Sequence, residues 1–333
     1  MPTLADEAPA AGPPAPPPRP RPVVDRPTRP DRLFSRVTTA AAGAMFALLF
    51  LIGFFLLLRA APALETAGWG FFTTVNWQLN ADPPVFGVLG MLSGTVIVGT
   101  IACVFALPVS VLAALFITEY ASPRLRTTLT GVVDLLAAIP SLLYGLWGMT
   151  FLNERIVPLS RWIGDNLGWI PIFDTAPEAE LTGSMFIAGL VVSLMVMPIT
   201  TSIMREVFAQ TPPGEKEAAL ALGGTRWGMI RSVVLPFGRG GVIGGSMLGL
   251  GRALGETIAV KLLLPQVPIL SADIMQDGGS TIAGFIAANA GTPDLAEELL
   301  ACGLVLFVFT IVINLAAAAI IARSRSGADV EAP

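Results

Sequence analysis

Long apolar stretches alternate with short polar segments along most of this chain. Each stretch has at least about 18 residues rich in Leu, Ile, Val, Ala, Phe and Gly, enough for a helix to cross roughly 30 Å of hydrocarbon. They predict six spanning helices, over residues 37–61, 87–118, 127–151, 183–204, 240–264 and 296–322. Because the sequence lacks the short alternating segments of a membrane barrel, we expect an all-α integral membrane protein.

Composition agrees with a membrane location. Of 333 residues, 53% are hydrophobic and 13% are charged, whereas a typical soluble domain is about 25% charged. Histidine is absent, which removes the commonest metal ligand and proton carrier. The two cysteines, Cys103 and Cys302, both fall in predicted spans, so no disulfide framework is expected outside the membrane. These features argue against a metal-centred enzyme.

Basic residues are divided unequally between the two sides of the predicted membrane. With the N-terminus inside, fifteen lie in cytoplasmic segments and three lie opposite, namely Arg59, Arg155 and Arg161. This imbalance places both termini of the multi-pass chain in the cytoplasm. Residues 1–36, rich in Pro, Ala and Arg, predict a disordered cytoplasmic tail. Residues 323–333 are expected to form a second tail, which leaves 37–322 as the membrane domain.

One polar loop, residues 205–239, has a pattern of its own. Its sequence predicts two short helices, with Thr211 capping the first, Pro212 and Pro213 in its opening turn, and Gly223–Gly224 ending it. Thr225 is expected to start the second helix, and Pro236 to separate that helix from the next span.

The loop carries Glu217, Ala218 and Ala219, and three residues separate Ala219 from Gly223. Leu235–Pro236 follows, with Leu235 twelve positions after Gly223. Ala218, Ala219 and Ala221 are expected to offer a smooth surface to a groove, and Glu217 a carboxylate to a basic partner. An amphipathic helix lying on the membrane is the alternative. The fixed spacing favours docking, and it resembles the cytoplasmic loop by which permeases of ABC importers bind their ATPase.

The fifth predicted span contains two charged residues. Arg252 lies about twelve residues in, or roughly 18 Å along a helix, where an arginine costs about 2.5 to 3.5 kcal/mol. Glu256 lies four residues further on and is expected on the same face. Either the two form a buried ion pair that joins helices, or Arg252 offers a fixed positive site to a crossing anion while Glu256 orients its guanidinium. Lys261, nearer the outer end, is expected to be an interface anchor.

The third predicted span contains Asp134 and Pro140. A proline can kink such a helix and free carbonyl groups for a polar cavity, here just before Ser141. Asp134 is expected either to serve transport or to pair with a loop arginine. We therefore assign the substrate pathway to Arg252, Glu256, Thr257 and Ser141.

Four segments together resemble the PstC-type permease subunit of bacterial phosphate ABC importers. They are Gly251–Thr257 (GRALGET), residues 139–148 (IPSLLYGLWG), residues 69–72 (WGFF) and the docking loop. The resemblance covers about residues 35–322, and the loop departs from the pattern only at Val233, where Ile is usual.

The resemblance implies an ABC importer permease (MetI-like) architecture in a bacterial plasma membrane. It further implies transport without catalysis, and four kinds of partner: a homologous PstA-type permease, a PstB-type ATPase dimer, a PstS-type phosphate-binding protein and membrane lipid, with no nucleic acid. In that family the arginine and glutamate that match Arg252 and Glu256 are regarded as important for transport, so the resemblance implies this role for both. No Gly-x-x-x-x-Gly-Lys-Ser/Thr segment occurs here, so ATP and Mg are expected on the partner ATPase and no cofactor on this chain.

Three alternatives stay open from the sequence. The substrate is another oxyanion, such as sulfate, molybdate or tungstate, since an arginine does not identify its anion. Alternatively the chain is a stand-alone anion channel or exchanger with Arg252 as its selectivity charge, against which the docking loop argues. An enzyme acting on lipid is the most distant, because no nucleophile and base pair is visible.

Overall fold

A computed structural model of the chain describes residues 28–82, 84–176, 178–270 and 273–325, with side chains up to residue 320 in the last segment. Within these ranges five helices are long and apolar enough to cross a membrane, and a sixth span is formed if two helices that meet at an angle of 87° count as one. The prediction of about six spanning helices is confirmed.

The first half of the described chain holds the elements α1 (Arg29–Ala67), α2 (Gly70–Thr73), β1 (Trp77–Gln78), β2 (Val85–Phe86), α3 (Leu89–Leu115), the π-helix η1 (Phe116–Tyr120), α4 (Pro123–Ala137), α5 (Ser141–Trp147), the π-helix η2 (Gly148–Leu152), α6 (Asn153–Leu167) and the 3₁₀ turn η3 (Pro171–Phe173). The second half holds α7 (Met185–Ala209), α8 (Pro213–Ala221), α9 (Arg226–Met229), the π-helix η4 (Ile230–Val234), α10 (Leu235–Leu254), α11 (Ile258–Leu263), α12 (Ile282–Asn289), the 3₁₀ turn η5 (Pro293–Leu295) and α13 (Ala296–Arg325). β1 and β2 pair antiparallel, with Trp77 opposite Phe86.

The chain divides into two compact units between Leu51 and Ile52, within α1. The described part of the first unit is the start of α1, where apolar side chains such as Leu33, Phe46 and Leu48 are exposed. The helix begins at Arg29, so residues 29–36 are helical and the predicted tail boundary at 36 is wrong. The rest of that tail prediction, residues 1–27, lies outside the described residues, as do residues 326–333 of the second predicted tail. α13 itself continues through Arg325, beyond the predicted boundary at 322.

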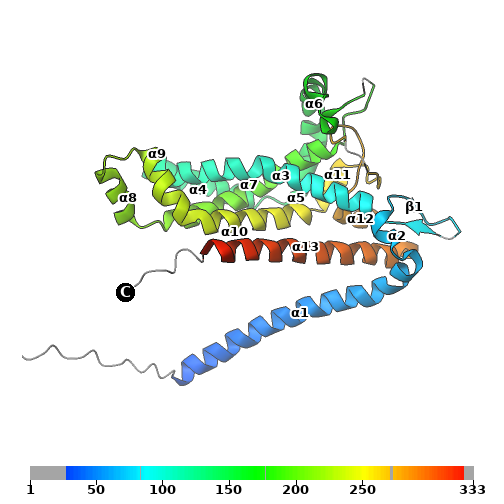
Figure 1. The fold of residues 1–333 in the computed structure, drawn as a ribbon, viewed down its shortest axis with the longest axis horizontal. Helices are drawn as coiled ribbons and strands as arrows, with labels where there is room; N and C mark the ends of the chain where they lie inside the picture. The colour runs from blue at the N-terminus through cyan, green and yellow to red at the C-terminus, as the bar shows by residue number, and fades with distance from the viewer. Residues whose placement is uncertain (1–27, 83, 177, 271–272, 326–333) are drawn as a thin grey trace, which may run out of the picture. The chain divides into compact units, whose positions relative to one another are not determined.

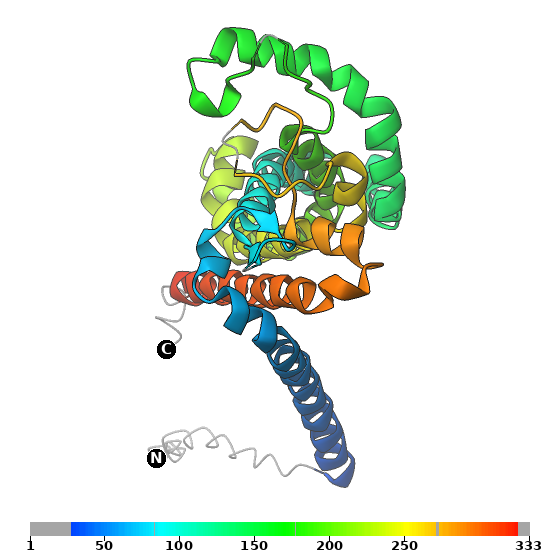
Figure 2. The same cartoon turned by 90° about the vertical axis from the view of Figure 1, so that its right-hand side faces the viewer.

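The second unit is a bundle around α3 and α7, which pack along each other and against α10 (Figure 1). Its central core is almost wholly apolar, with Val98 and Ala102 from α3, Val191 and Met195 from α7, and Val260 from α11. Figure 2 views the bundle nearly end on, with α13 along one side of it. Burying this many aliphatic side chains fixes the helix packing that positions the site described below.

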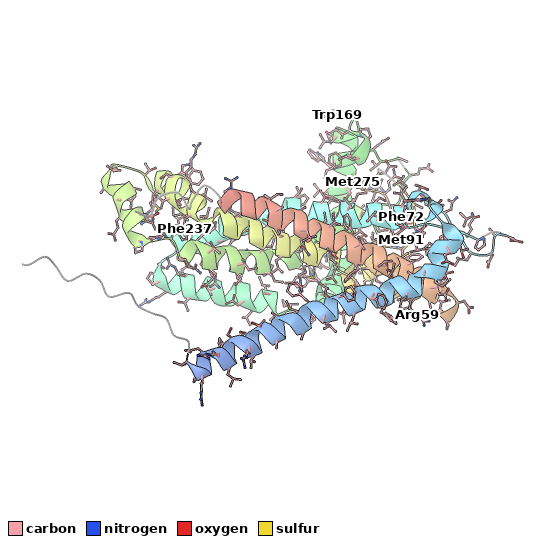
Figure 3. The ribbon with its side chains drawn as sticks, turned by 60° about the horizontal axis from the view of Figure 1, so that its bottom comes forward. Arg59, Phe72, Met91, Trp169, Phe237 and Met275 are labelled. Atoms are coloured by element: carbon pink, nitrogen blue, oxygen red, sulfur yellow. The ribbon has the colours of Figure 1, made fainter. Side chains whose placement is uncertain are left out.

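The two ends of this bundle differ in their elements. The α8 end carries α8 and α9, and the α12 end carries α12 and the β1–β2 hairpin (Figure 1). Phe237 lies toward the α8 end, and Phe72 and Trp169 lie toward the other (Figure 3). Each end has a small core of its own, around Phe208 and Ile230 at the α8 end and around Phe71 and Phe285 at the α12 end.

Trp69, Phe71, Phe72 and Trp77 form an aromatic group of the kind that suits a membrane interface, but it is divided between surface and core. Trp69 and Phe72 are exposed, whereas Phe71 is fully buried. Trp77 packs edge-on against Phe285, with ring centroids 4.9 Å apart. Part of this group therefore holds the α12 end together and does not face the interface.

The third predicted span is bent at Pro140. α4 ends at Ala137, α5 begins at Ser141, and the two directions differ by 87°. The hydroxyl of Tyr144 donates to the Leu136 carbonyl at 3.0 Å, which satisfies a backbone group freed by the break. The chain then continues as η2 and α6 to Leu167, beyond the predicted end of the span at residue 151. The predicted interruption of the 127–151 span at Pro140 is confirmed, and the proline turns the chain more sharply than a kink within one straight helix would.

The fifth predicted span is also broken, at its far end. α10 ends at Leu254, Gly255 is its C-cap, and a separate helix, α11, starts at Ile258. At its near end the helix is longer than predicted, because α9, η4 and α10 run on without interruption from Arg226. Pro236 sits in the first turn of α10, where its missing N–H is harmless, so it does not separate two helices as predicted.

Candidate functional site

Arg252 lies in the last turn of α10, directly before the break at Gly255. Its side chain is exposed in the single chain and lines a cavity of about 620 Å³. A cation at the C-terminal end of a helix is favoured by the helix dipole. The prediction that Arg252 offers a fixed positive site to an anion stays a prediction, and the proposal below rests on this position.

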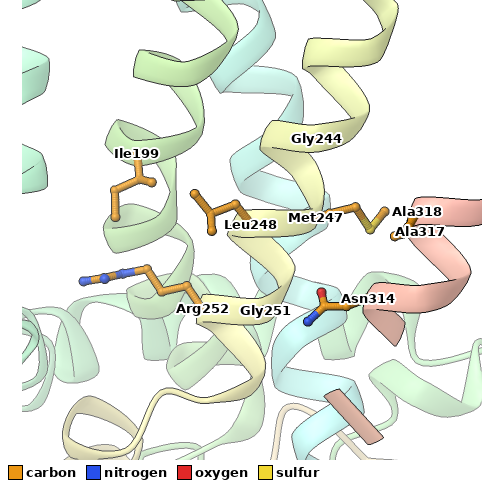
Figure 4. A pocket seen from close by; sticks show the side chains of 9 residues that line it. All are labelled: Ile199, Gly244, Met247, Leu248, Gly251, Arg252, Asn314, Ala317 and Ala318. Atoms are coloured by element: carbon orange, nitrogen blue, oxygen red, sulfur yellow. The ribbon is translucent and has the colours of Figure 1, made fainter. Parts of the chain in front are cut away.

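The cavity runs beside α10 between α7 and α13. Figure 4 shows Arg252 extending toward the side of Ile199, while Asn314 projects from α13 on the other side of α10. These two are the polar side chains of the lining, and the remainder is small or apolar: Ile199, Gly244, Met247, Leu248, Gly251, Ala317 and Ala318. A charge among apolar walls acts over a longer range than the same charge in open water.

Glu256 does not pair with Arg252. Its side chain is 8% exposed, and its Oε1 accepts a hydrogen bond from the Ala259 N–H at 3.1 Å. It therefore caps the start of α11, where a negative charge suits the helix dipole. No ion pair joins Glu256 to Arg252 within the described ranges, and the predicted shared face is wrong because the helix ends between them.

The two helix breaks lie beside each other. A Cβ added to Gly145 of α5 would stand 2.7 Å from the Ala259 Cα of α11, and one added to Gly148 would meet Leu263 at 3.3 Å. These contacts run in the same direction along both helices, so the starts of α5, at Ser141, and of α11, next to Thr257, lie on the same side. The Thr257 hydroxyl donates to the Gly255 carbonyl at 3.1 Å. Three predicted pathway residues, Ser141, Glu256 and Thr257, thus all belong to helix breaks.

Asp134 takes the structural role that the sequence offered as one of two alternatives. Its Oδ1 lies 3.7 Å from Nη2 of Arg205 and accepts from the Ser202 hydroxyl at 3.3 Å. The pair links α4 to α7. It leaves Asp134 with a partner on the neighbouring helix and no contact with the cavity beside α10.

α11 and the segment after it are held in place by side chains that the sequence did not single out for this role. Lys261, predicted to be an interface anchor, donates through Nζ to the Ala287 carbonyl at 2.8 Å. Gln266 adopts a positive φ of 58° and donates through Nε2 to the Val260 carbonyl at 3.0 Å. Gly284 of α12 leaves room for this amide, since a Cβ there would stand 2.7 Å from Oε1. A non-glycine residue at such a φ is costly, so packing must hold it.

The predicted docking loop contains the two expected short helices. Gly223, at φ 85°, ends α8, and the N–H groups of Gly223 and Gly224 bond to the carbonyls of Leu220 and Ala219. Thr225 caps α9 by accepting from the Gly228 N–H at 3.1 Å. The predicted cap at Thr211 is wrong: the N-cap is Pro212, and the Thr211 hydroxyl is buried without a hydrogen-bond partner.

The loop turns only some of its predicted docking residues outward. Glu217, Ala218, Gly223 and Pro236 are exposed. Ala219 and Leu235, in contrast, pack against the core of the α8 end, so they shape the loop from within. Sequence reasoning missed three large apolar side chains on the same surface, namely Leu220, Leu222 and Trp227. Leu222 is 90% exposed, and its place beside the helix-ending Gly223 was the signal that could have identified it.

Comparison with known proteins gives consistent matches over most of the chain. Residues 106–326 match the family model described as binding-protein-dependent transport system inner membrane component. The phosphate transport system permease protein PstC 2 of Mycobacterium tuberculosis is 42% identical over 306 residues, which cover 90% of this chain and 94% of the relative. The probable phosphate transport system permease protein PstC of Methanocaldococcus jannaschii is 35% identical over 294 residues, covering 85% and 90%.

Solved structures agree on the fold. A chain of the bacterial alginate ABC transporter, in complex with an alginate pentasaccharide-bound periplasmic protein, superposes with a TM-score of 0.57 at 18% identity, covering 86% of this chain and 93% of that one. A bacterial ABC transporter for the import of alginate gives a TM-score of 0.55 at 18% identity, covering 88% and 99%. These matches confirm the predicted fold, that of an ABC importer permease.

Proposed function

Because the chain belongs to the family of binding-protein-dependent transport system inner membrane components, in its PstC branch, we propose that it is the permease subunit of an ATP-driven importer of inorganic phosphate. The relatives that match it along nearly their whole length are phosphate transport permeases by name. The observation that carries the proposal is Arg252, an exposed cation at a helix break beside a cavity.

The charge of Arg252 is available to an anion. Its nearest carboxylate along the chain, Glu256, is committed to the Ala259 N–H. A guanidinium presents paired N–H donors that fit two oxygens of a phosphate, and the apolar lining of the cavity strengthens that attraction. In this mechanism the oxyanion passes Arg252 on the side of α10 that faces Ile199. Ser141 and Thr257, at the two adjacent helix breaks, complete the substrate pathway.

A second permease completes the path. The cavity is open in the single chain, and α10 presents exposed apolar side chains such as Leu248. Exposed apolar side chains beside a charge that is costly within a membrane favour contact with a protein partner over contact with water. We assign that partner to a homologous PstA-type permease, so that the anion passes between the two chains.

Energy enters through the α8 end. We assign the exposed surface of Glu217, Ala218 and Leu222 to contact with a PstB-type ATPase dimer, which binds the ATP and Mg. Ala219, Gly223, Leu235 and Pro236 set the shape of that loop. Exposed large apolar residues on a polar loop are typical of a binding surface. The α12 end, on the opposite side of the plasma membrane, then receives phosphate from a PstS-type binding protein.

The test is uptake of labelled phosphate by cells that lack this chain and are complemented with wild type, Arg252→Gln or Arg124→Gln. Arg124 is an exposed arginine of α4 outside the proposed pathway and serves as the matched control. We expect uptake to be restored by wild type and Arg124→Gln, and lost in Arg252→Gln with the protein still present in the membrane. Uptake that Arg252→Gln restores fully would refute the pathway assignment.

Competitors and energy dependence separate the alternatives in the same assay. Inhibition by excess sulfate or molybdate, without inhibition by unlabelled phosphate, would move the substrate to another oxyanion. Uptake that continues after ATP depletion would indicate an anion channel or exchanger. The proposal requires competition by phosphate and dependence on ATP.

A further inference from the structure

At its proposed cytoplasmic end α3 continues into the π-helix η1, and an ion pair links η1 to the docking loop. Nζ of Lys216, on α8, lies 2.6 Å from Oε1 of Glu119 in η1. The Glu119 side chain is 6% exposed and that of Lys216 is 20% exposed. Both charges are thus largely removed from water, unlike an ordinary surface pair.

Two further basic residues hold η1 from other elements. Arg126 of α4 donates through Nε to the Ile117 carbonyl at 3.0 Å and through Nη2 to the Thr118 carbonyl. Arg226 of α9 lies over the Tyr120 ring, 5.9 Å from its centroid. Carbonyls at a helix C-terminus attract cations, so η1 is a natural point of attachment. The docking helices therefore meet the bundle at this π-helix.

A buried ion pair is seldom the most stabilising arrangement for its volume, since desolvation offsets most of the attraction. What it provides is one defined geometry, because removing either partner leaves a charge buried alone. Lys216 directly precedes Glu217, the proposed ATPase contact, and points the other way, into the protein. One helix, α8, thus faces the ATPase with Glu217 and holds α3 with Lys216.

α3 connects this junction to the site. From Glu119 it runs back about 20 residues, roughly 30 Å at 1.5 Å per residue, to Gly99. There a Cβ would stand 2.8 Å from Cδ2 of Leu254, the last residue of α10, so the two helices are in close contact two residues beyond Arg252. A displacement of η1 along α3 would therefore reach the break that follows Arg252.

We propose that Lys216 and Glu119 are positioning residues that couple the docking helix to α3, so that movement of the ATPase is transmitted to the helix break beside Arg252. The inference rests on the proposed function. Neither residue contacts the substrate or the ATPase; both act through the geometry of α3 and α8.

The test uses the complete transporter, with its partner permease, ATPase dimer and binding protein, reconstituted in liposomes. Glu119→Gln and Lys216→Met are compared with the charge-exchanged double variant Glu119→Lys/Lys216→Glu. Glu206→Gln, an exposed carboxylate near the same end of α7, is the control for loss of one negative charge. Phosphate moved per ATP hydrolysed should fall about fivefold or more in each single variant, the lower range of ordinary coupling between sites. The double variant should recover most of it, and Glu206→Gln should match wild type.

A second readout does not depend on the substrate assignment. Stimulation of ATP hydrolysis by the binding protein, which acts from the α12 end, should be lost in the single variants and regained in the double variant. The coupling role would be overturned if the single variants assemble and keep the wild-type ratio of phosphate moved per ATP hydrolysed, together with the stimulation of ATP hydrolysis by the binding protein. If the single variants do not assemble, a double variant that assembles but stays uncoupled would overturn it as well. A wild-type complex that shows stimulation without phosphate transport would refute the proposed substrate and leave the coupling role standing.

Discussion

At the scale of single residues, the carboxylate of Glu256 is explained by the helix that follows it. The first N–H groups of α11 have no partner within that helix, and Glu256 supplies one to Ala259. Arg252, three positions before Gly255, lies in the last turn of the preceding helix. One short segment therefore places a cation in the last turn of one helix and an anion at the start of the next.

Substituting Glu256 separates its capping role from its charge. Loss of a cap acceptor typically costs about 1 kcal/mol, so Glu256→Ala should lower the thermal stability of the purified protein in detergent. Glu256→Gln keeps an oxygen acceptor and should lose less. Thermal unfolding of the two variants beside wild type is the measurement, and equal losses would show that the negative charge matters more than the hydrogen bond.

The residue types at the site were predictable, but their partners were not. An arginine deep in an apolar stretch is costly, which made Arg252 a candidate from sequence alone. Its pairing with Glu256 was extrapolated from an unbroken helix, and Gly255 gave too weak a signal for the break. Gln266 could not be found, because its place depends on a hydrogen bond back to Val260 and on the room that Gly284 of α12 leaves for its amide.

At the scale of elements, the contact between α5 and α11 is the tightest link between the two broken helices. Gly145 faces the Ala259 backbone, which cannot move aside as a flexible side chain can. The site residues Ser141 and Thr257 stand at the starts of these helices. Their relative placement therefore depends on the absence of a side chain at position 145.

Gly145→Ala should force α5 and α11 apart. Overpacking of this kind costs about 1 to 3 kcal/mol, and displacement of both breaks should also reduce transport. Gly131→Ala, in α4, is the matched control, because a Cβ there meets nothing within 4 Å. Thermal unfolding and phosphate uptake are compared for both variants. Wild-type uptake by Gly145→Ala would show that the two breaks need no fixed spacing.

The α8 surface gives a second prediction at this scale. Leu222 is 90% exposed, so replacing it should leave the fold intact while placing a charge in an apolar contact. Leu222→Glu should reduce co-purification of the ATPase about tenfold or more, which corresponds to roughly 1.4 kcal/mol of binding, and Glu217→Ala should act in the same direction. Gln210→Glu adds the same charge on an exposed position nearby and is the control. Full recovery of ATPase with Leu222→Glu would place the docking surface elsewhere.

The sequence predicted the position of a helix correctly where the length of an apolar stretch is enough to define it. The spans now seen as α3, α7 and α13 agree with prediction to within a few residues. The bent and broken spans were not predicted correctly, because the length of an apolar stretch carries no information about the direction of the chain within it. Pro140 marked an interruption, yet only packing of α5 on α11 fixes the turn at 87°. α6 was missed because Arg155, Arg161 and Asp165 make its sequence resemble a polar loop.

At the scale of the whole molecule, charge differs between the two ends of the bundle. Basic residues gather near the α8 end, and they are Arg124, Arg126, Arg205, Lys216, Arg226, Arg231 and Arg239. Acidic residues dominate the segments of the α12 end, and they are Glu178, Glu180, Asp273, Asp277, Asp294, Glu297 and Glu298. The positive-inside tendency favours a cytoplasmic position for the α8 end, where we assign ATPase binding, and this is the orientation we propose.

This orientation can be tested with two single cysteines in a chain whose Cys103 and Cys302 are replaced by alanine. Leu222 is 90% exposed at the α8 end and Trp169 is 79% exposed toward the other end, so both positions should react freely where reagent reaches them. A membrane-impermeant maleimide should label Trp169→Cys on cells stripped of their wall, and Leu222→Cys only after lysis. The cysteine-free chain should stay unlabelled, and uptake should persist in it because neither native cysteine lines the cavity beside Arg252. The reverse result, with Leu222→Cys labelled before lysis and Trp169→Cys only after lysis, would show the opposite orientation in the membrane. The proposed ATPase surface would then lie outside the cytoplasm, which would refute the importer mechanism as proposed.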